Sequence, residues 1–147
     1  SAQESTMQQN GDAGTVHEAT GFCWLCGRTP SLRPENFHSP YYLQVAHIAS
    51  GGGRAIRAND RRAVGLLCSL CHLVHVSDSD RLQAMNVGGQ DYPTIDERHT
   101  IFLKGVMDEE YYDLEYLSTI WIGNLPEPEP PPAFWSSQLY KRTGILL

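Results

Sequence analysis

The cysteines of this chain fall into two Cys-x-x-Cys pairs, Cys23/Cys26 and Cys68/Cys71, with no cysteine left over. Zinc favours four thiolates in a tetrahedron, and each Cys-x-x-Cys turn can supply two of them. The pairs therefore predict one closed zinc site with a structural role. A thioredoxin-like redox motif is the alternative, but no βαβ pattern surrounds either pair. Since a closed site has no open coordination position, we expect any chemistry to lie outside it.

Three histidines lie beside these pairs: His47 between them, and His72 and His75 directly after the second. Imidazole is the side chain whose ordinary pKa suits a base near neutral pH, and it also binds divalent cations. Taken singly, His47 could be a satisfied core histidine, and the other two could be helix surface. Together they predict a site where one imidazole activates water and another holds a cation against a phosphate.

Short elements are expected to position these side chains. Segment 41–48 is rich in aromatic and β-branched residues, which is typical of a strand, and 63–67 predicts a second short strand. The apolar pattern from 69 to about 76 favours a helix. We therefore expect an α+β fold in which the zinc site clamps the strand carrying His47 to the helix carrying His72.

The rest of the chain divides by composition. A Gln/Asn/Gly/Thr-rich start predicts disorder, and later segments predict helices, one from an N-cap at Thr94 to about 106 and one from 108 to 121. The apolar end of the chain must pack on its own domain or on a partner. The expected regions are a disordered tail (1–20), a metal-bearing module (21–78), a helical extension (79–125), a Pro-rich linker (126–132) and a C-terminal tail (133–147).

Charge is unevenly distributed. The net charge is −6, yet residues 20–75 contain six arginines against two acidic residues, a surplus of four positive charges that leaves ten net negative charges elsewhere. A locally basic segment is consistent with phosphate binding, and the acidic C-terminal half could bind a protein partner. No apolar run is long enough to cross a bilayer and no signal peptide is visible, so we expect a cytoplasmic protein without membrane association.

The combined motif resembles a known family. In chain order, the motif consists of Cys-x-x-Cys, Ala46-His47-Ile48, a Gly-rich loop, and Leu67-Cys68-x-x-Cys71-His72-x-x-His75. This order is similar to that of the HNH (His-Me finger, ββα-metal) endonucleases, especially the zinc-clamped proteins of phages and prophages. The resemblance covers roughly residues 21–78. It implies a ββα-metal module with additional C-terminal helices, and hydrolysis of DNA phosphodiester bonds leaving 5′-phosphate and 3′-hydroxyl ends. A phage-encoded member would act in the host cytoplasm.

The resemblance also implies residue roles. His47 matches the general base, and His72 matches a ligand of a catalytic divalent cation such as Mg²⁺. Asp60 and His75 are the further candidate ligands of that cation, beside the structural Zn²⁺. Contacts to DNA phosphates are expected from the arginines of the basic segment, Arg54, Arg57, Arg61 and Arg62.

Two positions depart from the family pattern. Ala46 stands where an Asp or His ligand is common before the base, and Ala63 stands where the middle Asn of the motif is expected; Asn59 and Asp60 are the nearest polar residues. These departures keep a second hypothesis open. It is a catalytically weak or inactive HNH-like zinc module that binds nucleic acid or a protein partner.

Overall fold

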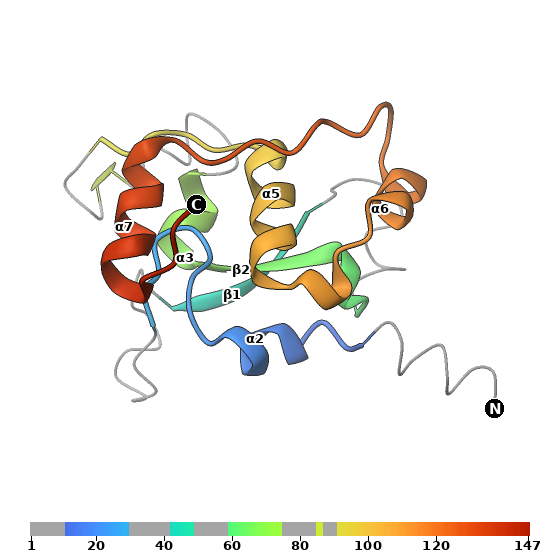
Figure 1. Ribbon diagram of the computed structural model, residues 1–147, viewed down its shortest axis with the longest axis horizontal. Helices are drawn as coiled ribbons and strands as arrows, with labels where there is room; N and C mark the ends of the chain where they lie inside the picture. The colour runs from blue at the N-terminus through green and yellow to red at the C-terminus, as the bar shows by residue number, and fades with distance from the viewer. Residues whose placement is uncertain (1–10, 30–41, 49–58, 75–84, 87–90) are drawn as a thin grey trace.

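A small antiparallel sheet crosses the centre of the molecule, with helix α2 below it and helix α5 above it in the view of Figure 1. The computed structural model describes residues 11–29, 42–48, 59–74, 85–86 and 91–147. Strand β1 (Leu43–His47) pairs with strand β2 (Val64–Cys68), so that Leu43 lies opposite Cys68 and His47 opposite Val64. This mixture of helices with a two-stranded sheet confirms the predicted α+β class.

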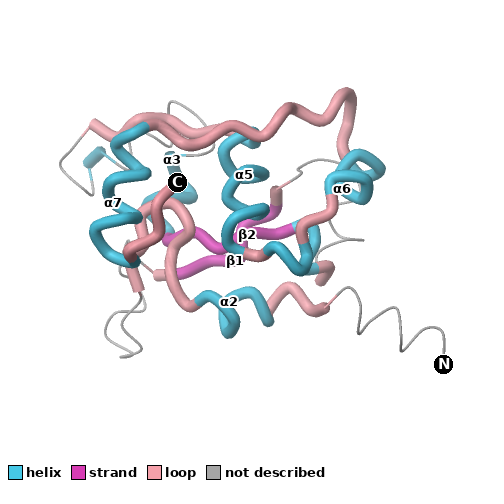
Figure 2. Tube along the Cα trace, in the orientation of Figure 1, coloured by secondary structure: helices cyan, strands magenta, loops and turns pink. Residues whose placement is uncertain are grey.

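Helices surround the sheet on several sides (Figure 2). Helix α7 and helix α6 lie toward opposite ends of the molecule, and α3 follows β2 directly. The helical elements of the described residues are α2 (Thr15–Thr20), the 3₁₀ turn η2 (Arg61–Ala63), α3 (Ser69–Val74), α5 (Glu97–Met107), the 3₁₀ turn η3 (Glu109–Tyr111), α6 (Leu114–Ile120) and α7 (Ala133–Thr143). Among these residues, no helix has the length and apolarity needed to span a bilayer.

Strand β2 is the most enclosed part of the chain, because every one of its residues is buried. Its sequence is apolar throughout, which suits a strand covered on both faces. Gly65 is required on one of these faces: a Cβ atom there would lie 2.9 Å from the ring of Trp24. The Trp24 ring is itself fully buried, so the indole packs directly on the backbone of β2.

The prediction of a disordered tail over 1–20 is wrong for residues 11–20. Six of them form α2 (Thr15–Thr20), in which Val16 is fully buried, and just before the helix the Ala13 amide donates to the Asn59 carbonyl at 2.9 Å. A six-residue helix is too short to be stable alone, so its formation depends on packing against the rest of the fold. The packing of α2 was not apparent from the sequence, because Val16 is the only large apolar side chain that the helix buries. Residues 1–10 lie outside the described part of the chain.

Both predicted C-terminal helices begin later than expected, for the same reason. Asp96, rather than Thr94, caps α5 by accepting from the Arg98 amide at 2.9 Å. Asp113 caps α6 by accepting from the Tyr116 amide at 2.9 Å, which separates α6 from η3 and splits the single helix predicted over 108–121. An Asp side chain bonds nearby amides readily, so it starts a helix better than it continues one.

The Pro-rich segment 126–132 crosses the N-terminal end of α5 between α6 and α7 (Figure 1). The Glu129 amide donates to the Arg98 carbonyl at 3.2 Å, and Pro131 is buried. Helix α7 then packs on its own domain through Trp135 and Leu139, which decides between the two alternatives left open for the tail. The Trp135 ring stacks on Tyr92, with centroids 5.5 Å apart.

Candidate functional site

The four cysteines converge into one buried cluster. Their sulfur atoms all lie within 4.8 Å of one another, and those of Cys26 and Cys68 are 3.8 Å apart. Sulfurs bound tetrahedrally to zinc at about 2.3 Å lie about 3.8 Å from each other. The cluster could therefore hold a metal ion such as zinc, as the cysteine spacing predicts.

The surroundings of the sulfurs favour a bound cation. Burial raises the pKa of the Cys23 and Cys71 thiols well above the ordinary value, because a desolvated thiolate is unstable. Hydrogen bonds from the other cysteines, that of Cys23 first, lower the pKa of Cys26. Arg28 Nη1 adds positive charge 3.7 Å from Cys26 Sγ. A divalent metal would offset the cost of burying the remaining thiolates.

Backbone geometry holds each cysteine pair in place. In the first pair, the Gly27 amide donates to the Cys23 carbonyl at 2.8 Å, and Gly27 adopts φ +78°, which favours glycine. The Trp24 amide donates to the Leu66 carbonyl at 2.9 Å, which ties this turn to β2. The second pair spans the junction of β2 and α3, since Cys68 ends the strand and Cys71 lies in the helix. The cluster thus joins the first turn to the strand and the helix.

His47 and His72 lie on the two elements predicted for them. His47 is the last residue of β1, and His72 lies on α3 next to Cys71. The Nδ1 atom of His72 is 2.8 Å from Oε1 of Gln44, also on β1. Gln44 precedes His47 by three residues, about 10 Å along a strand. The side chain of His72 is therefore directed onto the strand that carries His47.

The Gln44 side chain sets which ring nitrogen of His72 carries the proton, a role that the sequence analysis did not assign to it. An amide oxygen only accepts hydrogen bonds, so with this amide orientation the Nδ1 atom of His72 carries the proton. In the neutral ring the lone pair then lies on Nε2, the atom with which His72 could bind a cation. A polar residue three positions before the candidate base, on the same strand, was the available clue.

The candidate third ligand, Asp60, is engaged elsewhere. Its Oδ2 atom forms an ion pair with Arg62 Nη2 at 2.7 Å, and its Oδ1 accepts from the Arg62 amide at 3.0 Å. Burial raises the pKa of Asp60, but the hydrogen bonds from Arg62 outweigh burial and hold it below its ordinary value. Over the described ranges, only the cysteines form a group of three or more Cys, His, Asp or Glu side chains with clustered ligand atoms. His75 lies outside those ranges.

The arginines of the basic segment divide into two groups. Arg54 and Arg57 lie outside the described residues. Arg61 is buried, and its guanidinium donates to both carboxylate oxygens of Asp108, at 2.9 and 2.7 Å. Arg62 lies over the ring of Tyr116, 3.5 Å from its centroid. The structure thus gives Arg61 an internal partner instead of the predicted phosphate contact, and it leaves Arg62 partly exposed.

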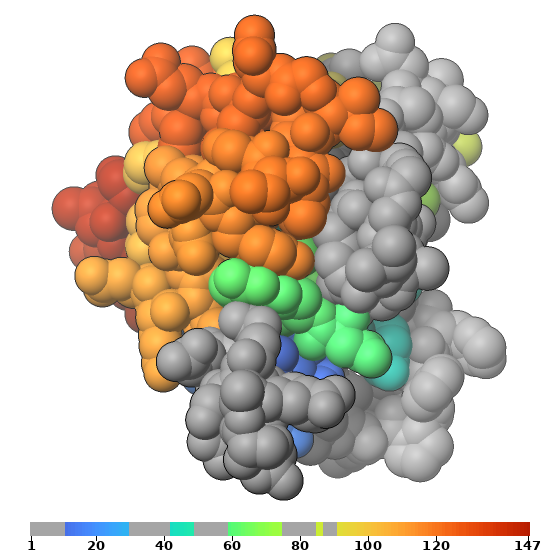
Figure 3. All heavy atoms as spheres, turned by 90° about the vertical axis from the view of Figure 1, so that its right-hand side faces the viewer, coloured from blue at the N-terminus to red at the C-terminus, as the bar shows by residue number. Residues whose placement is uncertain are grey.

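Residues around η2 reach the surface beside α6, as the space-filling view of Figure 3 shows in green below orange.

Both alanines that depart from the HNH pattern are buried: Ala46 pairs with Gly65 across the sheet, and the Ala63 carbonyl accepts from the Ile48 amide at 2.9 Å. These positions therefore contribute to packing in this chain.

Comparison with known proteins gives no relative: no family model, curated protein or solved structure matches the chain.

Proposed function

We propose that this protein is an HNH-type endonuclease that hydrolyses DNA phosphodiester bonds. The observation that carries the proposal is the arrangement around the cysteine cluster. Cys68 ends the strand paired with the strand of His47, and Cys71 adjoins His72 on α3. One clamp therefore fixes both histidine-bearing elements, and the resemblance of the same residues to the HNH motif supplies the chemistry.

In this proposal His47 is the general base. It accepts a proton from the water that attacks phosphorus, a task for which neutral imidazole is suited near pH 7. His72 binds a divalent cation through Nε2, with Gln44 holding Nδ1 and so the ring orientation. A cation bound there, such as Mg²⁺, would stabilise the negative charge that develops on the phosphate and the leaving oxygen.

Nicking of supercoiled plasmid DNA tests this function. Zinc-loaded protein is incubated with Mg²⁺ or Mn²⁺, and His47→Ala is compared with His17→Ala, which replaces a histidine on α2 that is not part of the cysteine cluster. We expect wild type and His17→Ala to nick, and His47→Ala to lose at least about a hundredfold in rate, the usual contribution of a general base. Zinc content should be equal in all three. Equal rates in His47→Ala and wild type, or no cleavage by wild type with any divalent metal, would refute the proposal.

Two observations favour a second candidate, a non-catalytic module on the same scaffold. Asp60 is paired with Arg62, and the alanines at the two ligand-bearing positions of the family are buried. Such a module would retain the cysteine cluster and bind nucleic acid without cutting it. Titration of the zinc-loaded protein with Mn²⁺ separates the candidates: a second cation site that is lost in His72→Ala supports the nuclease, and its absence supports the binding module.

A further inference from the structure

The two cysteine pairs are held in the fold by different means. The second pair lies on β2 and α3, so a strand and a helix fix its sulfurs. The first pair, Cys23 and Cys26, lies in a turn outside regular secondary structure, which the Trp24 amide joins to β2 by donating to the Leu66 carbonyl. Such turns open locally at a lower free energy than strands and helices in a core. We therefore expect the first pair to be the part of the cluster that opens first.

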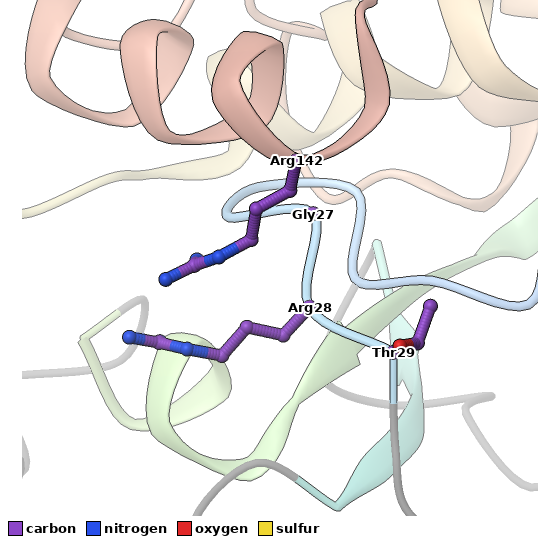
Figure 4. A pocket seen from close by; sticks show the side chains of 4 residues that line it. All are labelled: Gly27, Arg28, Thr29 and Arg142. Carbon is purple, nitrogen blue, oxygen red and sulfur yellow. The ribbon is translucent and has the colours of Figure 1, made fainter.

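The last turn of α7 lies directly against the turn of the first pair (Figure 4). A Cβ atom at Gly27 would lie 3.0 Å from the Cβ of Arg142 and 3.3 Å from the Leu139 carbonyl oxygen. Arg142 Nη1 also donates to the Cys26 carbonyl at 2.8 Å, and Figure 4 shows its side chain extending beside that of Arg28. Helix α7 is therefore bonded to the backbone of a residue that supplies one of the four sulfurs.

Packing anchors α7 beside the cluster. Trp135 is 1% exposed, belongs to the same apolar core as the four cysteines, and donates from Nε1 to the Pro93 carbonyl at 2.7 Å. Cys26 shares a hollow of about 30 Å³ with Trp135, Gln138 and Arg142 of α7. A hollow of this size has room for about one or two water molecules and for no chelating ligand.

We propose that α7 controls the release of metal from the cysteine cluster, so that zinc leaves only after α7 has detached from the turn of Cys26 and Gly27. All four cysteines are fully buried, so a competing ligand must wait for an opening before it can replace a thiolate. Detachment of α7 would free the first pair, while the second pair stays on β2 and α3. The inference concerns the metal cluster and does not depend on DNA cleavage, so it can fail or succeed separately from the nuclease proposal.

Transfer of zinc from the zinc-loaded full chain to an excess of pyridylazoresorcinol, a colorimetric chelator, measures the rate of release. The rate should reach a plateau as the chelator concentration rises, because opening of the protein then limits it. Arg142→Gln removes the charged donor to the Cys26 carbonyl and should raise the plateau about fivefold or more. Lys141→Gln removes the same charge from the adjacent exposed residue and should change the plateau less than about twofold.

A second variant separates the docking of α7 from the charge of Arg142. Leu139→Val weakens the packing of fully buried Leu139 and leaves every charge in place, so it should raise the plateau about threefold. Faster release in Arg142→Gln but not in Leu139→Val would mean that the arginine charge retains the metal, which overturns the inference. Release that rises linearly with chelator, without a plateau, would overturn it as well.

The rate of global unfolding provides the last comparison. It is measured in urea on the zinc-loaded protein and extrapolated to zero urea for wild type and both variants. We expect zinc release to be faster than global unfolding, and we expect Arg142→Gln to raise the release rate more than the unfolding rate. Equal rates of release and unfolding in all three proteins would show that the whole fold must open, and α7 would then have no separate role in metal release.

Discussion

Replacing Asp108 by alanine should destabilise the fold more than any single surface change, because this carboxylate joins two buried cations. Arg61 binds both of its oxygens, and Lys104 Nζ lies 2.6 Å from Oδ2. The side chains of Arg61, Asp108 and Lys104 are 11%, 3% and 0% exposed. Lys104 also donates to the Arg61 carbonyl, so the network ties α5 to η2, the turn that leads into β2.

The size of the effect follows from the charges left behind. Removing one partner of a buried ion pair costs about 3–5 kcal/mol, and Asp108→Ala leaves two cations without their shared anion. Desolvation already lowers the pKa of Lys104 to about 8, and loss of Asp108, which raises it, would lower it further. Lys104 can lose its proton instead of remaining charged and buried, and neutralising a lysine of ordinary pKa at pH 7 costs about 5 kcal/mol. This cost is the upper limit on the free energy of unfolding that is lost through Lys104. We therefore expect a loss of about 3–5 kcal/mol at pH 7.

The pH dependence provides an independent signature. In Asp108→Ala the folded-state pKa of Lys104 lies below the unfolded value, so the unfolded chain binds more protons between the two values. Stability must then rise with pH across that interval. Wild type, in which the pKa of Lys104 is about 8, gains about half as much stability between pH 7 and pH 9 as the variant can gain, so the deficit should shrink by up to about 1.4 kcal/mol. A simple cavity would give a deficit that does not change with pH.

Urea unfolding of the zinc-loaded protein at both pH values measures these differences. Glu129→Gln is the control, because Glu129 pairs with Arg98 at 3.1 Å but both side chains are about half exposed. Such a surface pair contributes at most about 1 kcal/mol. A deficit in Asp108→Ala no larger than that of Glu129→Gln, or one unchanged between pH 7 and pH 9, would show that the buried network does not hold α5 to η2 as argued.

Two further predictions concern the cluster and α7. Cys71→Ser should abolish stoichiometric zinc binding and unfold the protein at 25 °C, because the free energy of metal binding contributes directly to folding in small sites of this kind. Metal analysis measures the zinc content and circular dichroism measures the folded fraction. A variant that is folded and binds zinc would contradict the prediction. Zinc affinity of wild type should also rise with pH, since burial raises the pKa of Cys23 and Cys71 and binding must release those protons. Trp135→Ala should cost about 3–5 kcal/mol, because the buried ring stacks on Tyr92 and its Nε1 donates to the Pro93 carbonyl at 2.7 Å; a urea midpoint equal to that of wild type would mean that α7 is not part of the core.

The local parts of the site could be predicted from the sequence. A Cys-x-x-Cys turn presents two sulfurs whatever surrounds it, so two such turns without a spare cysteine indicated one metal cluster. The β-branched run around Val45 and the apolar pattern after Cys68 were sufficient to place His47 on a strand and His72 on a helix. Each of these inferences depends on residues within a few positions of one another.

Other features required the folded chain. The partner of Arg61 is 47 residues away, and nothing near Arg61 distinguishes it from Arg62, which remains partly exposed. Helix α2 gains its stability from contacts with residues around Asn59 and with the core, which local composition does not report.

The sequence by itself determined which side chains can bind a metal and on which elements the histidines lie, because spacing and periodicity are local properties. Only the tertiary structure decided which charges are buried, that Trp135 of α7 packs into the core that contains the cysteines, and that Arg28 lies beside Arg142. The physical reason is that charge pairing and burial depend on which distant segments touch, and a segment's own residues do not specify its neighbours.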